Sequence, residues 1–400
     1  MIYLDHNATA PLRREAREAM LRHLGATVGN ASSAHGGGRA ARAALERGRR
    51  DLAAAVGGQP SEVVITSGGT ESNNLALFGS VPEPQDAHLV VSPIEHASVL
   101  GPVRELERRG AQVTWLSVDG EGRIRPDDVG AALRPETALV SIGWANNEIG
   151  TVQPIAGISA VCRARGVRLH VDAAQALGKL PVDAGLVDLC TVSAHKLGGP
   201  IGVGALIVRR GMTLRPLCFG GEQERGRRPG TENVAGVVGF AAALAARAAS
   251  SAELTALRER LWTGVAAIGE IRRYSPVTAC LPNTLNVGFS GVRGEALVAA
   301  LDLEGVAVSV GSACAAGSAE PSHVLRAIGC NDAEAAGGVR FSLGCDTTEA
   351  EIDAAVAAVR RVIDRIRTVA DRSNLEGAAP SAPRVNPIGI ARTGSRPTVE

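Results

Sequence analysis

Apolar runs alternate with helix-like segments from about residue 40 to residue 250. Short runs rich in β-branched residues predict strands at residues 62–67, 88–92, 112–118, 138–145, 167–173, 189–194 and 205–210. Before and between these strands, apolar positions recur at helical spacing in residues 39–57, 71–80, 98–110 and 158–166. Strands that alternate with helices are typical of a mostly parallel sheet covered by helices, so we predict an α/β fold.

The pattern changes after about residue 250, where helical and strand-like segments follow in an α+β arrangement up to residue 370. We therefore predict a large domain at residues 15–255 and a smaller α+β domain that combines residues 1–14 with residues 256–370. Residues 371–400 are rich in Pro, Gly, Ser and Ala without periodicity, which predicts a disordered tail.

Composition and charge exclude several classes of partner. The chain has 400 residues, of which 45% are hydrophobic, and its 42 basic residues balance its 41 acidic ones. No strong field would attract nucleic acid or an anionic membrane. The longest apolar stretch starts at Val234 and is interrupted by Arg247 before it reaches the ~20 residues that a bilayer requires. We expect neither nucleic acid nor a membrane as a partner.

The cysteines and the N-terminus predict a reducing compartment. Seven cysteines are scattered along the chain without CxxC pairs, which indicates neither a disulfide framework nor a structural metal site. The first residues lack the basic and apolar regions of a secretory signal. We expect a cytoplasmic protein with no bound metal.

A glycine-rich turn follows the predicted strand at residues 62–67. Gly68, Gly69 and Thr70 lead directly into a helix. Backbone N–H groups at a helix N-terminus bind anions, and glycines permit close approach, so this turn suits a phosphate. The alternative is an ordinary strand–helix turn with a good N-cap.

Polar side chains also follow two neighbouring predicted strands. Asp172 and Gln175 come after one strand, and Ser193, His195 and Lys196 come at the end of the next. The carboxyl ends of strands in an α/β sheet form the usual ligand site. A lysine, a carboxylate and a phosphate cradle together meet the requirements of pyridoxal 5'-phosphate (PLP). Taken alone, Asp172 could equally be a helix N-cap.

Eight blocks of sequence carry a resemblance to a known family. In chain order they are YLDHNATAP, SGGTESNN, EHASVL, NNEIGTVQPI, HVDAAQALGKLP, SAHKLGGPIGVGAL, GGEQERGRRPGTENVAG and GSACAAGSAEPSHVLRAIG. As an ordered set they closely resemble cysteine desulfurases, a branch of the class V aminotransferase superfamily. The resemblance implies PLP-dependent fold type I, with the last block similar to the long-loop subgroup associated with iron–sulfur assembly.

The resemblance also implies a role for each residue around the cofactor ring. Lys196 would bind PLP covalently, Asp172 would hold the ring nitrogen, and His96 would stack on the ring. The ring hydroxyl would be contacted by Gln175 and Asn147. For an isolated His or Asn such as His96 or Asn147, a satisfied structural polar group is the alternative interpretation.

The phosphate and the substrate would be bound by a second group of residues. The resemblance places Gly69, Thr70, Ser193 and His195 on the phosphate, joined by Thr231 from a neighbouring subunit. That contact implies a homodimer. Arg340, with Asn147, would bind the substrate carboxylate, for which a bidentate guanidinium is well suited.

Cys314 determines the chemistry that we predict. Its surroundings, SVGSACAAGSAEPS, are mostly Gly, Ser and Ala, which predicts a mobile loop, and a chance cysteine in such a loop is the alternative. In a cysteine desulfurase, L-cysteine would displace Lys196 from PLP, and Lys196 would then remove the Cα proton. The Cys314 thiolate, with His96 as a candidate proton acceptor, would attack the substrate sulfur. The products would be L-alanine and a persulfide.

The persulfide would pass to a sulfur-acceptor protein in iron–sulfur assembly or in the thiolation of a cofactor or tRNA. Three other functions stay open: a selenocysteine lyase, another class V aminotransferase, and a non-enzymatic scaffold or sulfur-relay partner. The cysteine loop argues against simple transamination, which needs no thiol.

Overall fold

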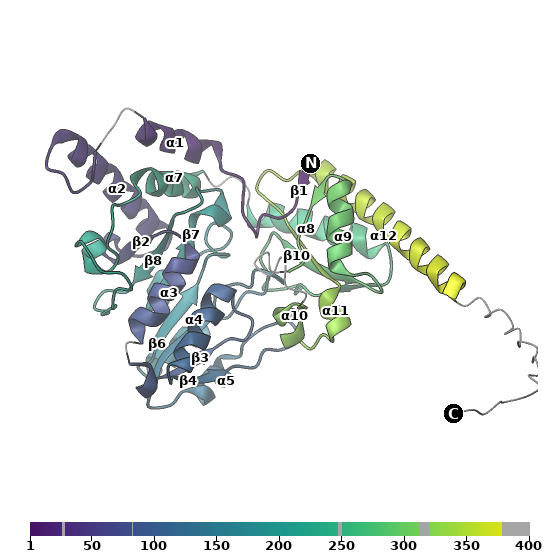
Figure 1. The fold of residues 1–400 in the computed structure, drawn as a ribbon, viewed down its shortest axis with the longest axis horizontal. Helices are drawn as coiled ribbons and strands as arrows, with labels where there is room; N and C mark the ends of the chain where they lie inside the picture. The colour runs from purple at the N-terminus through teal and green to yellow at the C-terminus, as the bar shows by residue number, and fades with distance from the viewer. Residues whose placement is uncertain (26–28, 82, 247–249, 312–319, 378–400) are drawn as a thin grey trace, which may run out of the picture.

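The structure is a computed structural model that describes residues 1–25, 29–81, 83–246, 250–311 and 320–377, with no side chains described for residues 369–377. Figure 1 shows two lobes, a large one in purple, blue and teal and a smaller one in green and yellow. The N-terminal segment crosses from the smaller lobe to the larger one. The N-terminal segment therefore contacts both lobes.

A seven-stranded sheet forms the centre of the large lobe. Its strand order is β2-β8-β7-β6-β5-β3-β4, and only β8 runs antiparallel to its neighbours. The predicted mostly parallel sheet is therefore confirmed. The strands are β2 (Val63–Thr66), β3 (His88–Val91), β4 (Gln112–Trp115), β5 (Thr137–Gly143), β6 (Arg168–Asp172), β7 (Leu189–Ser193) and β8 (Gly204–Val208).

Helices cover both faces of this sheet. Successive side chains of a strand point to opposite faces, so Val63 and Ile65 of β2 join one apolar core and Val64 joins another. Residues of α2, α5, α6 and α7 belong to the first core, and residues of α3 and α4 belong to the second. The helices are α1 (Arg14–Leu24), α2 (Gly36–Ala55), α3 (Gly69–Ser80), α4 (Ala97–Arg108), α5 (Pro126–Ala132), α6 (Ile155–Ala164) and α7 (Val234–Ala245).

The apolar stretch at Val234 forms α7, which packs against α1 and α2. Among the residues that the structure describes, no helix is both long and apolar enough to span a membrane. Short 3₁₀ helices complete the large lobe: η1 (Pro60–Glu62), η2 (Pro84–Asp86), η3 (Ala184–Leu186), η4 (Ala194–Leu197) and η5 (Gln223–Gly226).

The small lobe has its own sheet and its own core. Three antiparallel strands run in the order β12-β10-β9, and a separate apolar cluster joins them to α8, α9 and α12. The elements are α8 (Ser251–Ala266), β9 (Ile271–Arg273), β10 (Thr284–Phe289), α9 (Gly294–Leu303), β11 (Val306–Ala307), α10 (His323–Ala327), α11 (Asp332–Ala336), β12 (Gly338–Ser342) and α12 (Glu349–Gly377).

Both ends of the described chain extend the small lobe. Strand β1 (Ile2–Tyr3) pairs in parallel with β11, and Leu4 is part of the small-lobe core. Helix α12 runs to Gly377, beyond residue 370 at which we expected the tail to begin, because no proline or glycine interrupts it before that glycine. Residues 378–400 of the predicted tail lie outside the described part of the chain.

A buried ion pair fixes η5 against the large sheet. The Arg49 guanidinium of α2 donates to both carboxylate oxygens of Glu224 at 2.6 and 2.7 Å, and the side chains are only 4% and 2% exposed. Glu224 also accepts a hydrogen bond from the backbone N–H of Ile65 at 2.9 Å. Glu224 and Arg225 have φ values of 48° and 59°, an unfavourable conformation for side-chain-bearing residues that these contacts hold in place.

Replacing Arg49 by Met should destabilise the protein by ~3–5 kcal/mol, because it leaves a carboxylate buried without its countercharge. The midpoint of urea unfolding measures this loss. Arg50→Met, an exposed position on the same helix, is the matched control and should change the midpoint little. If Arg49→Met unfolds at the same urea concentration as wild type, the ion pair does not stabilise the fold.

Candidate active site

A cavity of about 270 Å³ lies where the carboxyl ends of the large-sheet strands meet the small lobe. Every residue that we predicted to bind cofactor or substrate lines it, except Thr231. These residues are Gly69, Thr70, His96, Asn147, Asp172, Gln175, Ser193, His195, Lys196 and Arg340. Thr231 is described but exposed, and the predicted nucleophile Cys314 lies outside the described residues.

The sheet explains why residues so distant in sequence meet. Asp172 ends β6, and Ser193 ends the neighbouring parallel strand β7. The chain then forms η4, which carries His195 and Lys196. The carboxyl ends of parallel strands lie at the same edge of a sheet, so these side chains reach one space.

One end of the cavity has the features of an anion site. Helix α3 begins at Gly69, directly after Gly68 with its φ of 151°, a conformation that favours glycine. The N–H groups of a first helical turn have no partners within the helix. The buried Ser193 hydroxyl, which lines the cavity, has no hydrogen-bond partner among the described residues.

The Asp172 carboxylate is held by two donors. Its Oδ1 accepts from the backbone N–H of Ala174 at 2.9 Å, and its Oδ2 accepts from Asn73 Nδ2 at 2.7 Å. Asn73 Nδ2 also lies 2.8 Å from Ser98 Oγ, to which it donates. Asn73 is a positioning contact that the sequence did not single out.

His96 is oriented by the same network. Its Nδ1 accepts from the backbone N–H of Ser98 at 3.1 Å and lies 2.7 Å from Ser98 Oγ. With Nδ1 acting as an acceptor, a neutral ring carries its proton on Nε2. Burial lowers the pKa of His96, an effect that Asp172 opposes and Lys196 reinforces, so the ring is neutral near pH 7.

The Lys196 amine is hydrogen-bonded to the N-terminal segment. Lys196 Nζ donates to the backbone carbonyls of Asn7 and Ala8, both at 2.8 Å. Asn7 and Ala8 line the cavity, although we had assigned them no role. Their block, YLDHNATAP, was part of the resemblance, but nothing in the sequence places it beside residue 196.

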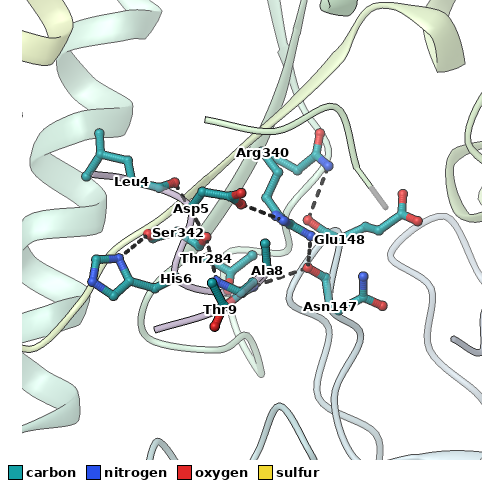
Figure 2. A network of polar contacts seen from close by, with 12 residues as sticks. Leu4, Asp5, His6, Ala8, Thr9, Asn147, Glu148, Thr284, Arg340 and Ser342 are labelled. Atoms are coloured by element: carbon teal, nitrogen blue, oxygen red, sulfur yellow. Dashed lines mark hydrogen bonds and ion pairs between the residues drawn. The ribbon is translucent and has the colours of Figure 1, made fainter. Parts of the chain in front are cut away.

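Arg340 reaches the cavity from β12 of the small lobe. Its side chain is 1% exposed; one terminal nitrogen donates to Asp5 Oδ1 at 2.7 Å and the other to the backbone carbonyl of Asn147 at 3.1 Å, as Figure 2 shows. Its buried Nε has no partner among the described residues. The guanidinium is therefore fixed in direction, and three of its five N–H donors, that of Nε among them, are not used in these two contacts.

Comparisons with known proteins identify the family. The model of the class V aminotransferases matches residues 2–355. The chain is 43% identical to a cysteine desulfurase IscS of Dictyoglomus turgidum, over 92% of this chain and 96% of that protein. It is 45% identical to a cysteine desulfurase IscS of Salmonella schwarzengrund, over 92% and 93% of the two chains. The chain belongs to the class V aminotransferase family.

Solved structures agree with this assignment. A NifS-like protein superimposes with a TM-score of 0.84 at 35% identity, covering 91% of this chain and 99% of that one. SspA in complex with cysteine superimposes with a TM-score of 0.79 at 35% identity, covering 87% and 100%. The resemblance found in the sequence is thus confirmed, and the protein is a PLP-dependent enzyme of fold type I.

The described residues fit PLP. The unpartnered Ser193 hydroxyl and the N-terminus of α3 suit its phosphate. Asp172, held by Ala174 and Asn73, suits a protonated ring nitrogen. Lys196 lines the same cavity, which is the arrangement that covalent attachment of the cofactor needs.

Glu95 is a further residue of this site to which the sequence assigned no role. It lines the cavity, is buried, and accepts from the backbone N–H of Gly143 at 2.8 Å. Burial raises the pKa of Glu95 from 4.5 to about 8, and the nearby Asp172 charge acts in the same direction. Glu95 is therefore mostly protonated at pH 7 and adds little negative charge beside Asp172.

Glu95→Gln should make stability less dependent on pH. Between pH 4.5 and about pH 8 the folded protein keeps a proton on Glu95 that the unfolded chain releases, so this group's contribution to stability falls as the pH rises through that window. The melting temperature of wild type, relative to that of Glu95→Gln, should thus decrease from pH 5 to pH 8. If the melting temperatures of wild type and Glu95→Gln differ by the same amount at every pH in this range, the pKa of Glu95 is not raised in the folded protein.

Proposed function

We propose that this protein is a cysteine desulfurase that converts L-cysteine to L-alanine and retains the sulfur as a persulfide on Cys314. The observation that carries the proposal is the single cavity that brings Lys196, Asp172 and the buried guanidinium of Arg340 together. A reactive lysine, a carboxylate and a directed cation are the groups that a PLP-dependent reaction of an amino acid requires. The names of the relatives, cysteine desulfurase, and the neighbour solved with cysteine support L-cysteine as the substrate.

Four residues that line the cavity would each have a defined task in this reaction. When bound, PLP supplies an electron sink that accepts the electron pairs released as bonds to the substrate Cα and Cβ break. Asp172 would hold the proton of the ring nitrogen, and Arg340 would hold the substrate carboxylate. Lys196 Nζ would take the Cα proton as general base. His96 would contact the ring in its neutral form.

Cys314 supplies the nucleophile for sulfur. Its thiolate attacks the substrate sulfur, the substrate Cβ–S bond breaks, and protonation of Cβ leads to L-alanine. The position of Ser309 supports the proposal that Cys314 can approach the substrate. The backbones of Ser309 and Arg340 exchange hydrogen bonds of 2.7 and 3.2 Å, so Ser309 lies beside the residue that would bind the substrate carboxylate. Cys314 lies five residues after Ser309, and five extended residues span at most ~17 Å. A thiol on such a tether can reach the substrate that Arg340 binds.

The assembly and the location of the enzyme are part of the same proposal. Thr231 is exposed and does not line the cavity of its own chain, which supports a homodimer in which it contacts the phosphate of the neighbouring subunit. The persulfide then passes to a sulfur-acceptor protein, for which iron–sulfur assembly fits the IscS relatives. The six described cysteines are all unpaired, which supports a reducing, cytoplasmic compartment.

Cys314→Ala should separate cofactor binding from sulfur transfer. We expect the variant to keep the visible absorbance of bound PLP while its release of sulfide and alanine from L-cysteine, with a thiol reductant present, falls on the order of 10³-fold or more. Cys218→Ala, which removes an exposed thiol, is the matched control and should keep full activity. Full sulfur release by Cys314→Ala would replace the persulfide mechanism with a direct elimination.

A further inference from the structure

The basic residues of the chain are almost all arginines. Of 42 lysines and arginines, 40 are arginine, and the two lysines are Lys179 and Lys196. Lys196 is the proposed reactive amine, whereas Lys179 does not line the cofactor cavity. A surface charge would be met equally well by arginine, which this chain uses in place of lysine at every position except 179 and 196. A compact ammonium group differs from a guanidinium in its size and in the placement of its donors, which points to a specific task at position 179.

The contacts of Lys179 indicate that task. Lys179 Nζ donates to Gln175 Oε1 at 2.7 Å and to Asn7 Oδ1 at 3.0 Å. It forms no ion pair in the part of the chain that the structure describes. Burial, reinforced by the charges of Lys196 and Arg340, holds the pKa of Lys179 well below its usual value. Both the neutral and the charged amine donate hydrogen bonds, so these two contacts do not depend on its protonation.

Two contacts fix which way the Gln175 amide points. The Asn7 backbone carbonyl only accepts hydrogen bonds, so the amide atom 2.9 Å from it is the nitrogen. The amide oxygen then lies 2.7 Å from Lys179 Nζ, which donates to it in either protonation state. An NH₂ group has a second hydrogen, and Gln175 lines the cofactor cavity. That hydrogen is left to face the cavity.

We propose that Lys179 is a positioning residue that fixes the Gln175 amide with its NH₂ group toward the cofactor. The inference rests on the proposed role of Gln175 at the ring hydroxyl of PLP. An ionised ring oxygen accepts a hydrogen bond from NH₂ but would be repelled by a carbonyl oxygen. Without Lys179 only the Asn7 carbonyl holds the amide, so its NH₂ group is less firmly directed and PLP binds less well.

The test compares Lys179→Met, Gln175→Ala and the double variant in the full-length protein. PLP affinity is measured by titrating each apoprotein with PLP, and the visible absorbance maximum of the bound cofactor is recorded. We expect Lys179→Met to weaken PLP binding about tenfold and to shift the absorbance maximum. In the Gln175→Ala background, Lys179→Met should have little further effect, because its target is already absent.

The variant Gln175→Glu is a second test, which remains informative even if Lys179→Met does not fold. Lys179 would hold one carboxylate oxygen and the other would face PLP, so we expect weaker binding than in Gln175→Ala. Three outcomes would each overturn the role of Lys179 and leave the proposed function intact. The first is wild-type PLP affinity and absorbance in Lys179→Met. The others are an undiminished effect of Lys179→Met in the Gln175→Ala background, and wild-type PLP affinity in Gln175→Glu. Failure of wild type to bind PLP would overturn the proposed function as well.

Discussion

One buried asparagine, Asn7, bonds to both lobes at the active site, in the segment that crosses between them. Toward the small lobe, its side chain bonds to Asn283 at 3.1 Å and to Thr284 at 2.8 Å, and its backbone N–H bonds to Ser342 at 2.9 Å. Toward the large lobe, its backbone carbonyl accepts from Gln175 and Lys196. A buried polar group that lost these partners would be costly, so the segment has few alternative positions.

The same segment connects the substrate-binding and the reactive ends of the site. Asp5, two residues before Asn7, pairs with Arg340 of the small lobe, whereas Asn7 and Ala8 hold the Lys196 amine of the large lobe. The distance between the group that would bind the substrate carboxylate and the group that would take the Cα proton is thus set by a short turn, in which the Ala8 N–H donates to the Asp5 carbonyl at 3.0 Å. Reaction geometry of this kind is sensitive to shifts of about 1 Å.

The sequence could predict the position of a residue in the site where that position follows from the strand or helix that carries the residue. Asp172, Ser193 and Lys196 follow strand ends of a parallel sheet, so periodicity and turn chemistry were sufficient to bring them together. Asn7 and Lys179 are 172 residues apart, and Glu95 and Gly143 are 48 apart. Such contacts depend on how lobes and loops pack, which no local pattern encodes. The contact that we propose for Thr231 would further require a second copy of the chain.

A crystal structure of the purified protein with PLP would test the central claim most directly. We expect continuous electron density from Lys196 Nζ to the cofactor, with Asp172 at the ring nitrogen, Gln175 at the ring hydroxyl and Ser193 at the phosphate. Density for PLP outside this cavity, or a Lys196 amine still bonded to Asn7 and Ala8 beside an unattached cofactor, would contradict the account.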